Sequence, residues 1–189
     1  MDESDQKLVE GYLNGDDPSF EILLKKYLKP VYNFLFSLVR DAHQAEDLAQ
    51  ITFVKAWKNI RRYDRKKSFK TWLFTIARNS ALDYFKKKKT IPFSDFSDAT
   101  GYNPLENMPD EQILPDELLE KIDSRGEFEK ILEKIPAPYQ LILNLRYKED
   151  FSLAEIAGIL KTPYNTVKSR HQRALAALKK VIIQRRKTD

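Results

Sequence analysis

The chain has 189 residues, of which 42% are hydrophobic, with a net charge of +5 and no cysteine. This length allows one domain or two small ones of about 70–100 residues each. The absence of cysteine excludes disulfides and thiolate metal sites. No run approaches the ~18 apolar residues of a membrane span, and the acidic first residues lack the apolar core of a signal peptide. We therefore expect a cytoplasmic protein without membrane insertion.

The charge is segregated along the chain. Between Lys55 and Lys89, thirteen Lys and Arg residues accompany only two acids and are interleaved with aromatic residues. The next stretch, residues 90–120, contains eight acids and no Lys or Arg, and basic charge returns between Lys161 and Lys187. Cations beside aromatic rings suit single-stranded nucleic acid, whose phosphates attract charge and whose unstacked bases stack on rings.

Apolar residues at helical spacing predict four helices in the first half of the chain, and five glycines in all also favour helix over strand. Breaks at Asn14–Pro18 and before Ser68 separate them, and Pro30 is expected to bend the second. The predicted helices cover about residues 8–13, 20–38, 44–60 and 68–89. They predict one all-α domain over residues 1–89.

Residues 90–123 are predicted to be an acidic, flexible linker. They hold four of the nine prolines and show no sustained apolar period. Two interpretations stay open, a solvated tether and a segment that occupies a basic channel on a partner. A second small helical domain is then expected over residues 124–189, beginning with a capping box at Ser124–Glu127.

A helix-turn-helix is predicted inside this second domain. Ser152–Glu155 has capping-box spacing and opens a short helix that ends near Leu160. Thr162 and Pro163 then supply an N-cap and a proline at the first helical position. Two short helices that flank a tight turn are typical of modules that bind duplex DNA.

The second helix of this motif has one apolar and one polar face. A rotation of about 100° per residue predicts a buried face with Tyr164, Val167, His171, Ala174, Leu175 and Leu178. The polar face holds Asn165, Ser169, Gln172, Arg173 and Ala176, with Thr166, Lys168 and Arg170 on its flanks. Donors and small residues suit entry into a major groove. A solvated basic surface is the alternative, and the matching first helix argues against it. His171 is expected at the core edge or facing phosphate.

Three segments together resemble a known family. Residues 45–57 (AEDLAQITFVKAW) resemble the core-binding helix of bacterial sigma factors, and residues 69–79 (FKTWLFTIARN) resemble the promoter-melting helix that follows it. Residues 166–170 (TVKSR), with Arg173, resemble the recognition helix. The order and spacing of these motifs, on a short chain with two helical domains, are similar to the extracytoplasmic-function (ECF) group.

The resemblance implies a surface that binds core RNA polymerase, at the coiled-coil helices of its largest subunit. The residues it assigns to this surface are Glu46, Asp47, Gln50 and Phe53. A charged rim beside an aromatic anchor fits a protein interface. Ile51 departs from the family, in which an acidic residue is common at this position, and Trp57 is expected mainly in the core.

The resemblance also implies that the first domain captures the melted −10 strand of promoter DNA. The assigned residues are Lys55, Asn59, Arg61, Arg62, Tyr63, Lys66 and Asn79. Tyr63 is expected to stack on a base, which is worth ~1–3 kcal/mol, and the two asparagines are expected to bond base edges. Trp72 is expected in the core rather than as a wedge between bases.

For the duplex −35 element the implied readers lie on the second helix of the helix-turn-helix. They are Thr166, Lys168, Ser169, Arg170, Gln172 and Arg173. Arg173 or Lys168 would pair with guanine and Gln172 with adenine, whereas Arg170 would neutralise phosphate. By resemblance, an anti-sigma factor is expected as a further partner.

Two alternatives to a sigma factor stay open from the residues alone. A conventional regulator would need a ligand pocket or dimer interface in residues 1–89, and a protein that coats nucleic acid would not need the capped recognition helix. An enzyme is not expected, because the chain has only His43 and His171 and no glycine-rich phosphate loop. We predict no catalytic residue, no cofactor and no metal.

Overall fold

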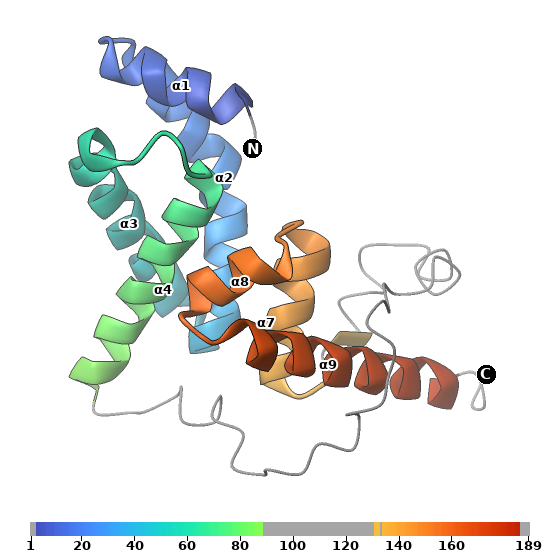
Figure 1. The fold of residues 1–189 in the computed structure, drawn as a ribbon. Coiled ribbons are helices and arrows are strands. Elements are labelled where there is room, and N and C mark those ends of the chain that lie inside the picture. Colours follow the sequence, from blue (N-terminus) through green and yellow to red (C-terminus); the bar gives the residue numbers. More distant parts are fainter. Residues whose placement is uncertain (1–2, 89–130, 133, 186–189) are drawn as a thin grey trace.

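A computed structural model describes residues 3–88, 131–132 and 134–185, and all regular elements in these ranges are helical. The first half comprises α1 (Glu3–Leu13), α2 (Asp17–Val39), α3 (Ala42–Asn59), the 3₁₀ turn η1 (Ile60–Arg62) and α4 (Phe69–Lys87). The second half comprises α7 (Ala137–Leu143), the π-helical turn η3 (Asn144–Lys148), α8 (Leu153–Leu160) and α9 (Tyr164–Arg185) (Figure 1). The all-α prediction is confirmed. The predicted linker and the capping box at Ser124 lie outside the described residues.

Local turn and capping chemistry sets the boundaries of the helices in the first half. Between α1 and α2 the chain turns at Gly15, whose φ of 99° is in a region that side chains disfavour. The side chain of Asp41 caps α3 by accepting a hydrogen bond from the Gln44 amide at 3.0 Å. Ser68 caps α4 in the same way, accepting from the Thr71 amide at 3.3 Å. The predicted start near Ser68 is therefore confirmed.

Helix α2 forms the centre of the first half. It runs as one element through Pro30, although proline lacks the N–H that an inner helical turn normally uses. Its buried face packs against α1, α3 and α4. Leu23, Val31 and Leu35 on this face are almost fully buried. Helix α1 lies at the end of the α2–α4 bundle, next to the turn that leads into α4 (Figure 1).

The helix-turn-helix is present as predicted. Ser152 accepts from the Glu155 amide at 3.2 Å, and the Glu155 carboxylate accepts from the Ser152 amide at 2.9 Å, which completes the capping box. Lys161 ends α8 in the left-handed region with φ 51°. The carbonyl of Pro163 then accepts from the amides of Thr166 and Val167 in the first turn of α9. Thr162 was predicted to cap this helix, but its hydroxyl instead donates back to the Leu160 carbonyl at 3.4 Å. The turn and both helix ends are thus set by neighbouring residues.

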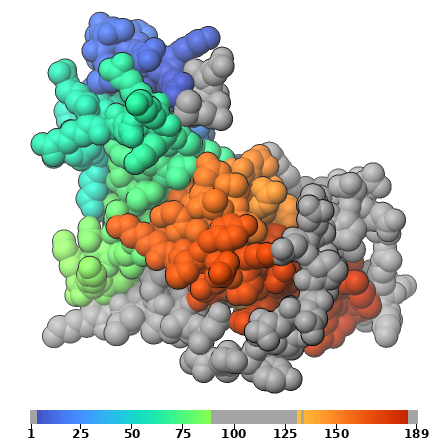
Figure 2. Space-filling view, viewed as in Figure 1, coloured from blue at the N-terminus to red at the C-terminus, as the bar shows by residue number. Residues whose placement is uncertain are grey.

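The two halves of the molecule pack against each other. Helix α8 lies on α4 and α7 lies on α2, so that residues of both halves share one hydrophobic core. On the surface, α4 and the helix-turn-helix meet without a gap (Figure 2). Phe151, just before α8, is buried and meets the ring of Phe74 at 4.9 Å in an edge-to-face arrangement. Beside this pair, Lys70 Nζ lies 3.3 Å from the Glu149 carboxylate and also donates to the Glu149 carbonyl. In the described conformation, the N-terminal and C-terminal halves are therefore in direct contact.

Candidate nucleic-acid and polymerase interfaces

Residues 61–68, which comprise the last two residues of η1 and the segment that joins it to α4, carry a dense set of exposed cations, and we call them the basic loop. All of its Lys and Arg side chains are exposed: Arg61, Arg62, Arg65, Lys66 and Lys67. Such a cluster attracts phosphate, and like charges this close together repel one another. The loop therefore needs internal contacts to keep one shape.

Tyr63 supplies the main internal contact of the basic loop. Its ring is only 6% exposed and packs against Phe69 at 5.7 Å and Trp72 at 5.1 Å. Its hydroxyl donates to the Lys67 carbonyl, which closes the loop. Burial, and then the charges of nearby carboxylates, raise the pKa of Tyr63. The expectation that Tyr63 offers an open face to a base is wrong in this conformation, because the ring is a buried anchor.

Asp64 sets the turn within the basic loop. Its carboxylate accepts from the Lys66 amide at 3.0 Å, and its carbonyl accepts from the Lys67 amide at 3.0 Å. The one acid among the cations thus has a structural role that charge counting alone does not indicate. As expected, Trp72 is a half-buried packing residue, which lies against Phe69 as well as Tyr63.

The other predicted −10 residues come from α3 and α4. Lys55 pairs with Asp83 across the two helices at 3.1 Å. The Asn59 amide donates to the Lys55 carbonyl at 2.8 Å, and the Asn79 side-chain oxygen accepts from Arg78 at 3.2 Å. Both asparagines are half-buried and engaged with neighbours. A base edge would therefore have to compete with these contacts.

Arg78 is a contact residue that the sequence analysis did not identify. It donates to the carbonyl of Leu160 at the end of α8, at 3.1 Å, so it links α4 to the helix-turn-helix. Burial lowers the pKa of its guanidinium. A second link joins the Thr71 hydroxyl to the Glu155 carboxylate at 3.0 Å. These pairs are more than 80 residues apart, and no local pattern in the sequence indicates them.

The outer face of α3 matches the predicted polymerase surface in its polar part only. Glu46, Asp47 and Gln50 are exposed, as expected. Phe53 is 8% exposed and belongs to the core, so its prediction as a contact residue is wrong for this conformation. Trp57, expected in the core, is 52% exposed.

Phe53 is buried and Trp57 is exposed, the reverse of the prediction, and this has a geometric cause. The buried face of α3 is made by Ala45, Leu48, Ala49, Thr52, Phe53 and Ala56. Each step of four residues advances a side chain by about 40° around a helix. Trp57 therefore lies past the edge of this face, where it joins Ile51 and Val54 in an exposed apolar stripe. Apolar anchors beside polar groups are typical of a protein-binding surface.

Helix α9 presents most of its predicted readers. Thr166, Lys168, Ser169, Gln172 and Arg173 are each partly exposed. The predicted buried face is confirmed at Val167, His171, Ala174, Leu175 and Leu178. The prediction that Tyr164 belongs to this face is wrong, because this residue at the helix start is 50% exposed.

Arg170 requires a correction. It was predicted to neutralise phosphate, but it is only 4% exposed. It follows Val167 by three residues, which on a helix places it beside the buried face. In this conformation its side chain is buried in the C-terminal half and does not face solvent.

His171 is a buried neutral base at the core edge of α9. Its Nε2 lies 3.0 Å from the hydroxyl of Tyr147, and the two rings stack at 5.7 Å. Burial, and then the charge of Arg146, lower the pKa of His171 to about 4. The imidazole is therefore uncharged at neutral pH, which agrees with the core-edge expectation and not with phosphate contact.

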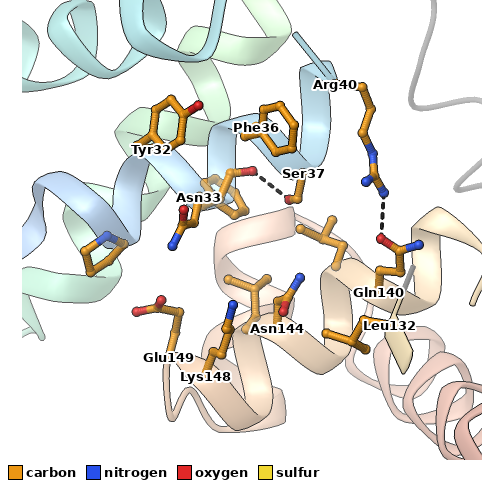
Figure 3. A pocket seen from close by; sticks show the side chains of 14 residues that line it. Tyr32, Asn33, Phe36, Ser37, Arg40, Leu132, Gln140, Asn144, Lys148 and Glu149 are labelled. Atoms are coloured by element: carbon orange, nitrogen blue, oxygen red, sulfur yellow. Dashed lines mark hydrogen bonds between the residues drawn. The ribbon is translucent and has the colours of Figure 1, made fainter. Parts of the chain in front are cut away.

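A pocket of about 320 Å³ lies where the two domains meet, between α2 and the α7–η3 segment (Figure 3). Arg40, the C-cap residue of α2, donates across it to the side chain of Gln140 at 2.8 Å. The side-chain oxygen of Asn144 is buried on its wall, and none of the described residues forms a hydrogen bond with it. Among the described residues there is no group of three or more His, Cys, Asp or Glu placed to hold a metal. In the same part of the chain, no helix is long and apolar enough to cross a membrane.

Comparison with known proteins agrees with this geometry. The family described as Sigma-70 region 2 matches residues 23–91, and the family described as Sigma-70, region 4 matches residues 125–178. The ECF RNA polymerase sigma factor SigW of Bacillus subtilis (strain 168) is 30% identical over 177 residues, which cover 93% of this chain and 95% of SigW. SigM of the same organism is 32% identical over 158 residues, covering 83% and 91% of the two chains.

Two solved structures share the fold. CnrH, in complex with the cytosolic domain of CnrY, matches with a TM-score of 0.61 at 20% identity, covering 96% of this chain and 98% of CnrH. The sigma factor RpoE of Bartonella quintana, in complex with the anti-sigma factor NepR, matches with a TM-score of 0.57 at 24% identity, covering 86% and 96%. The two family matches and the full-length relatives, together with the helix-turn-helix and the basic loop, show that this chain belongs to the ECF group of RNA polymerase sigma factors.

Proposed function

We propose that this protein binds core RNA polymerase through α3 and directs it to promoters by contacting two DNA elements. The basic loop captures the melted −10 strand, and the polar face of α9 reads the −35 duplex. The observation that carries the proposal is the pairing, in one chain, of exposed cations on a buried aromatic anchor with a capped helix-turn-helix. A single-strand site and a duplex site together suit DNA that is partly melted.

The polymerase contact is proposed for the outer face of α3. Glu46, Asp47 and Gln50 supply the polar part, as the sequence predicted, while the exposed Trp57 takes the anchoring role first assigned to Phe53. Exposed tryptophans are among the residues that contribute most to interface affinity. Since Trp57 is not needed in the core of the described domain, its substitution would affect binding rather than folding.

Single-strand capture is proposed to use phosphate contacts from Arg61, Arg62 and Lys66, all of which are exposed. Lys55, Asn59 and Asn79 are proposed to lie at the base edges, after exchange of their present partners. Tyr63 contributes by holding the loop, and not by stacking in the described conformation.

Duplex reading is proposed for α9. Lys168, Gln172 and Arg173 are the proposed base readers, with Thr166 and Ser169 beside them. The Ser169 hydroxyl donates to the Thr166 carbonyl at 3.1 Å, within the helix, and leaves its lone pairs for another donor. Bidentate contacts from such residues provide about 1–3 kcal/mol of discrimination per base pair.

An anti-sigma factor is proposed as a regulatory partner. Both solved structures named above contain a second protein, the cytosolic domain of CnrY with CnrH and the anti-sigma factor NepR with RpoE. The exposed apolar stripe of α3 would also need cover when no polymerase is bound, because such surfaces favour association.

Transcription in vitro tests the proposal. Core polymerase is incubated with genomic fragments, with and without the full chain, and transcripts are mapped. The proposal predicts discrete start sites that depend on the chain, and co-purification of the chain with core. Transcripts that are the same with and without the chain would overturn it. Binding to fragments without any effect on core would favour a conventional regulator.

A further inference from the structure

Helix α1 lies outside the family match, which begins at residue 23, yet it contacts the basic loop directly. The Gln6 side-chain amide donates to the Arg65 carbonyl at 2.7 Å, across 59 residues of sequence. One turn further along, the Glu10 carboxylate lies 3.9 Å from the Arg65 guanidinium. Both contacts hold the middle of the loop, which is the part furthest from its two helix ends.

A second connection runs from α1 to the buried side of the loop. Asp5 is only 2% exposed, and its carboxylate accepts from the Tyr27 hydroxyl and lies 2.6 Å from Lys26 Nζ. The ring of Tyr27 packs on Phe69 at 5.9 Å, and Phe69 in turn meets Tyr63. The charge of Asp5 also contributes, after burial, to the raised pKa of Tyr63, which places the carboxylate electrostatically close to the loop anchor.

These contacts have more than a stabilising role if the loop binds a strand. A flexible loop with five like charges spreads over many shapes, and binding would have to select one of them. Contacts that hold the loop in one shape beforehand remove part of this cost and raise affinity. Gln6 acts on the loop backbone from outside, and Asp5 acts on its aromatic anchor from inside.

We infer that α1 is a brace that holds the basic loop in its strand-binding shape, with Gln6 and Asp5 as positioning residues for single-strand capture. The inference deepens the proposed function, and its last step depends on that function. Neither residue touches DNA in this scheme. Both act through the geometry of Arg65 and Tyr63.

The first arm of the test measures the shape of the loop without DNA. The Gln6→Met variant keeps the length of the side chain and removes the donor. Trypsin cuts after Lys and Arg, so its cleavage rate within residues 61–67 of the full chain reports loop opening. The brace predicts cleavage there about 2- to 10-fold faster, since one hydrogen bond is lost. Cleavage after Lys86–Lys88, at the far end of α4, is the internal reference and stays unchanged.

The second arm measures capture of the strand by the holoenzyme, with a fluorescent single-stranded −10 oligonucleotide. The brace predicts a loss of affinity of about 2- to 10-fold for Gln6→Met, with an unchanged midpoint of thermal unfolding. Asn14→Met removes an exposed amide just beyond the end of α1 and is the matched control, with no change in either arm. Asp5→Asn keeps the shape of the side chain but removes its charge, and is expected to act in the same direction.

The outcomes separate the brace from the proposed function. Faster cleavage of the loop together with weaker strand binding supports the inference. Weaker binding without faster cleavage overturns the brace, and faster cleavage with unchanged binding overturns the positioning role. If the unmodified holoenzyme does not bind the oligonucleotide, the proposed function fails, while the cleavage arm still decides whether α1 holds the loop.

Discussion

The two regions that we propose to contact DNA present their cations by different means. On α9 the side chains of Lys168 and Arg173 are spaced by the helix itself, and local caps set where the motif begins. In the basic loop the cations depend on Tyr63 and on contacts from a helix more than 50 residues away. Substitutions of distant residues should therefore leave the α9 face unchanged but alter the shape of the basic loop. Substitutions in the two regions test this difference.

The largest effect is expected at the loop anchor. Tyr63→Ala removes a buried ring and should destabilise the N-terminal half by about 3–5 kcal/mol. Tyr63→Phe keeps the ring, removes only the hydroxyl bond to the Lys67 carbonyl, and should cost about 1 kcal/mol. Urea unfolding of both variants measures the difference. If Tyr63→Ala costs no more than Tyr63→Phe, the ring is not a buried anchor and the contrast fails.

A pH effect is expected at the buried base of α9. Above pH 6.5, His171 is neutral in the folded and the unfolded chain alike. As pH falls from 6.5 towards 4, His171 becomes protonated in the unfolded chain but stays mostly neutral in the folded chain. The free energy of unfolding therefore falls over this pH window. The loss amounts to roughly 3 kcal/mol for a shift of this size.

The matching variant for this pH effect is His171→Gln, which can still accept from the Tyr147 hydroxyl. The difference in unfolding free energy between the two proteins should fall between pH 6.5 and 4. A difference that is independent of pH would show that His171 titrates normally in the folded chain.

Two arginines of α9 should respond in opposite ways. Arg173→Ala is expected to relax base preference at one −35 position by about 1–3 kcal/mol and to leave thermal stability unchanged. Arg170→Ala is expected to lower stability first, because its side chain is buried. Affinity for a promoter and its single-base variants, measured beside thermal melting, separates the two. A selective loss of base preference in Arg170→Ala would return that residue to the DNA surface.

The smallest effect is expected at the start of α8. Ser152→Ala removes the N-cap oxygen of the capping box and should cost about 1 kcal/mol. Because α8 packs on α4, we expect this loss in the unfolding of the whole described core. The basic loop should keep its rate of tryptic cleavage. Faster cleavage in this variant would show that the loop and the helix-turn-helix are not independent.

The sequence predicted those features that depend on neighbouring residues. The capping box at Ser152, the start of α4 at Ser68 and the buried positions Val167 and Leu178 follow from local chemistry and helical spacing, and the structure agrees with them. The exposure of Trp57 and the burial of Phe53 were predicted the wrong way round. The two residues lie on opposite sides of the edge of one helical face, where helical spacing alone does not determine which side chain is buried.

Contacts between distant parts of the chain could not be predicted. The bond from Gln6 to Arg65 and the contact of Phe74 with Phe151 join segments that share no periodic pattern. The burial of Tyr63 depends on Phe69 and Trp72 together, so a tyrosine within a basic loop suggested base stacking instead. On α9 the sequence therefore predicted the exposure of the candidate residues except Arg170, and in the loop it predicted only the exposed charges.

We propose that the basic loop binds single-stranded DNA and that α9 binds duplex DNA. The most direct test of this proposal is the affinity of the holoenzyme for a single-stranded −10 oligonucleotide and for a −35 duplex, with two variants. We expect the exposed pair Arg61→Ala and Arg62→Ala to weaken binding of the single strand only, and Arg173→Ala to weaken binding of the duplex only. If either variant lost affinity equally for both DNA probes, the proposed division between the basic loop and α9 would be wrong.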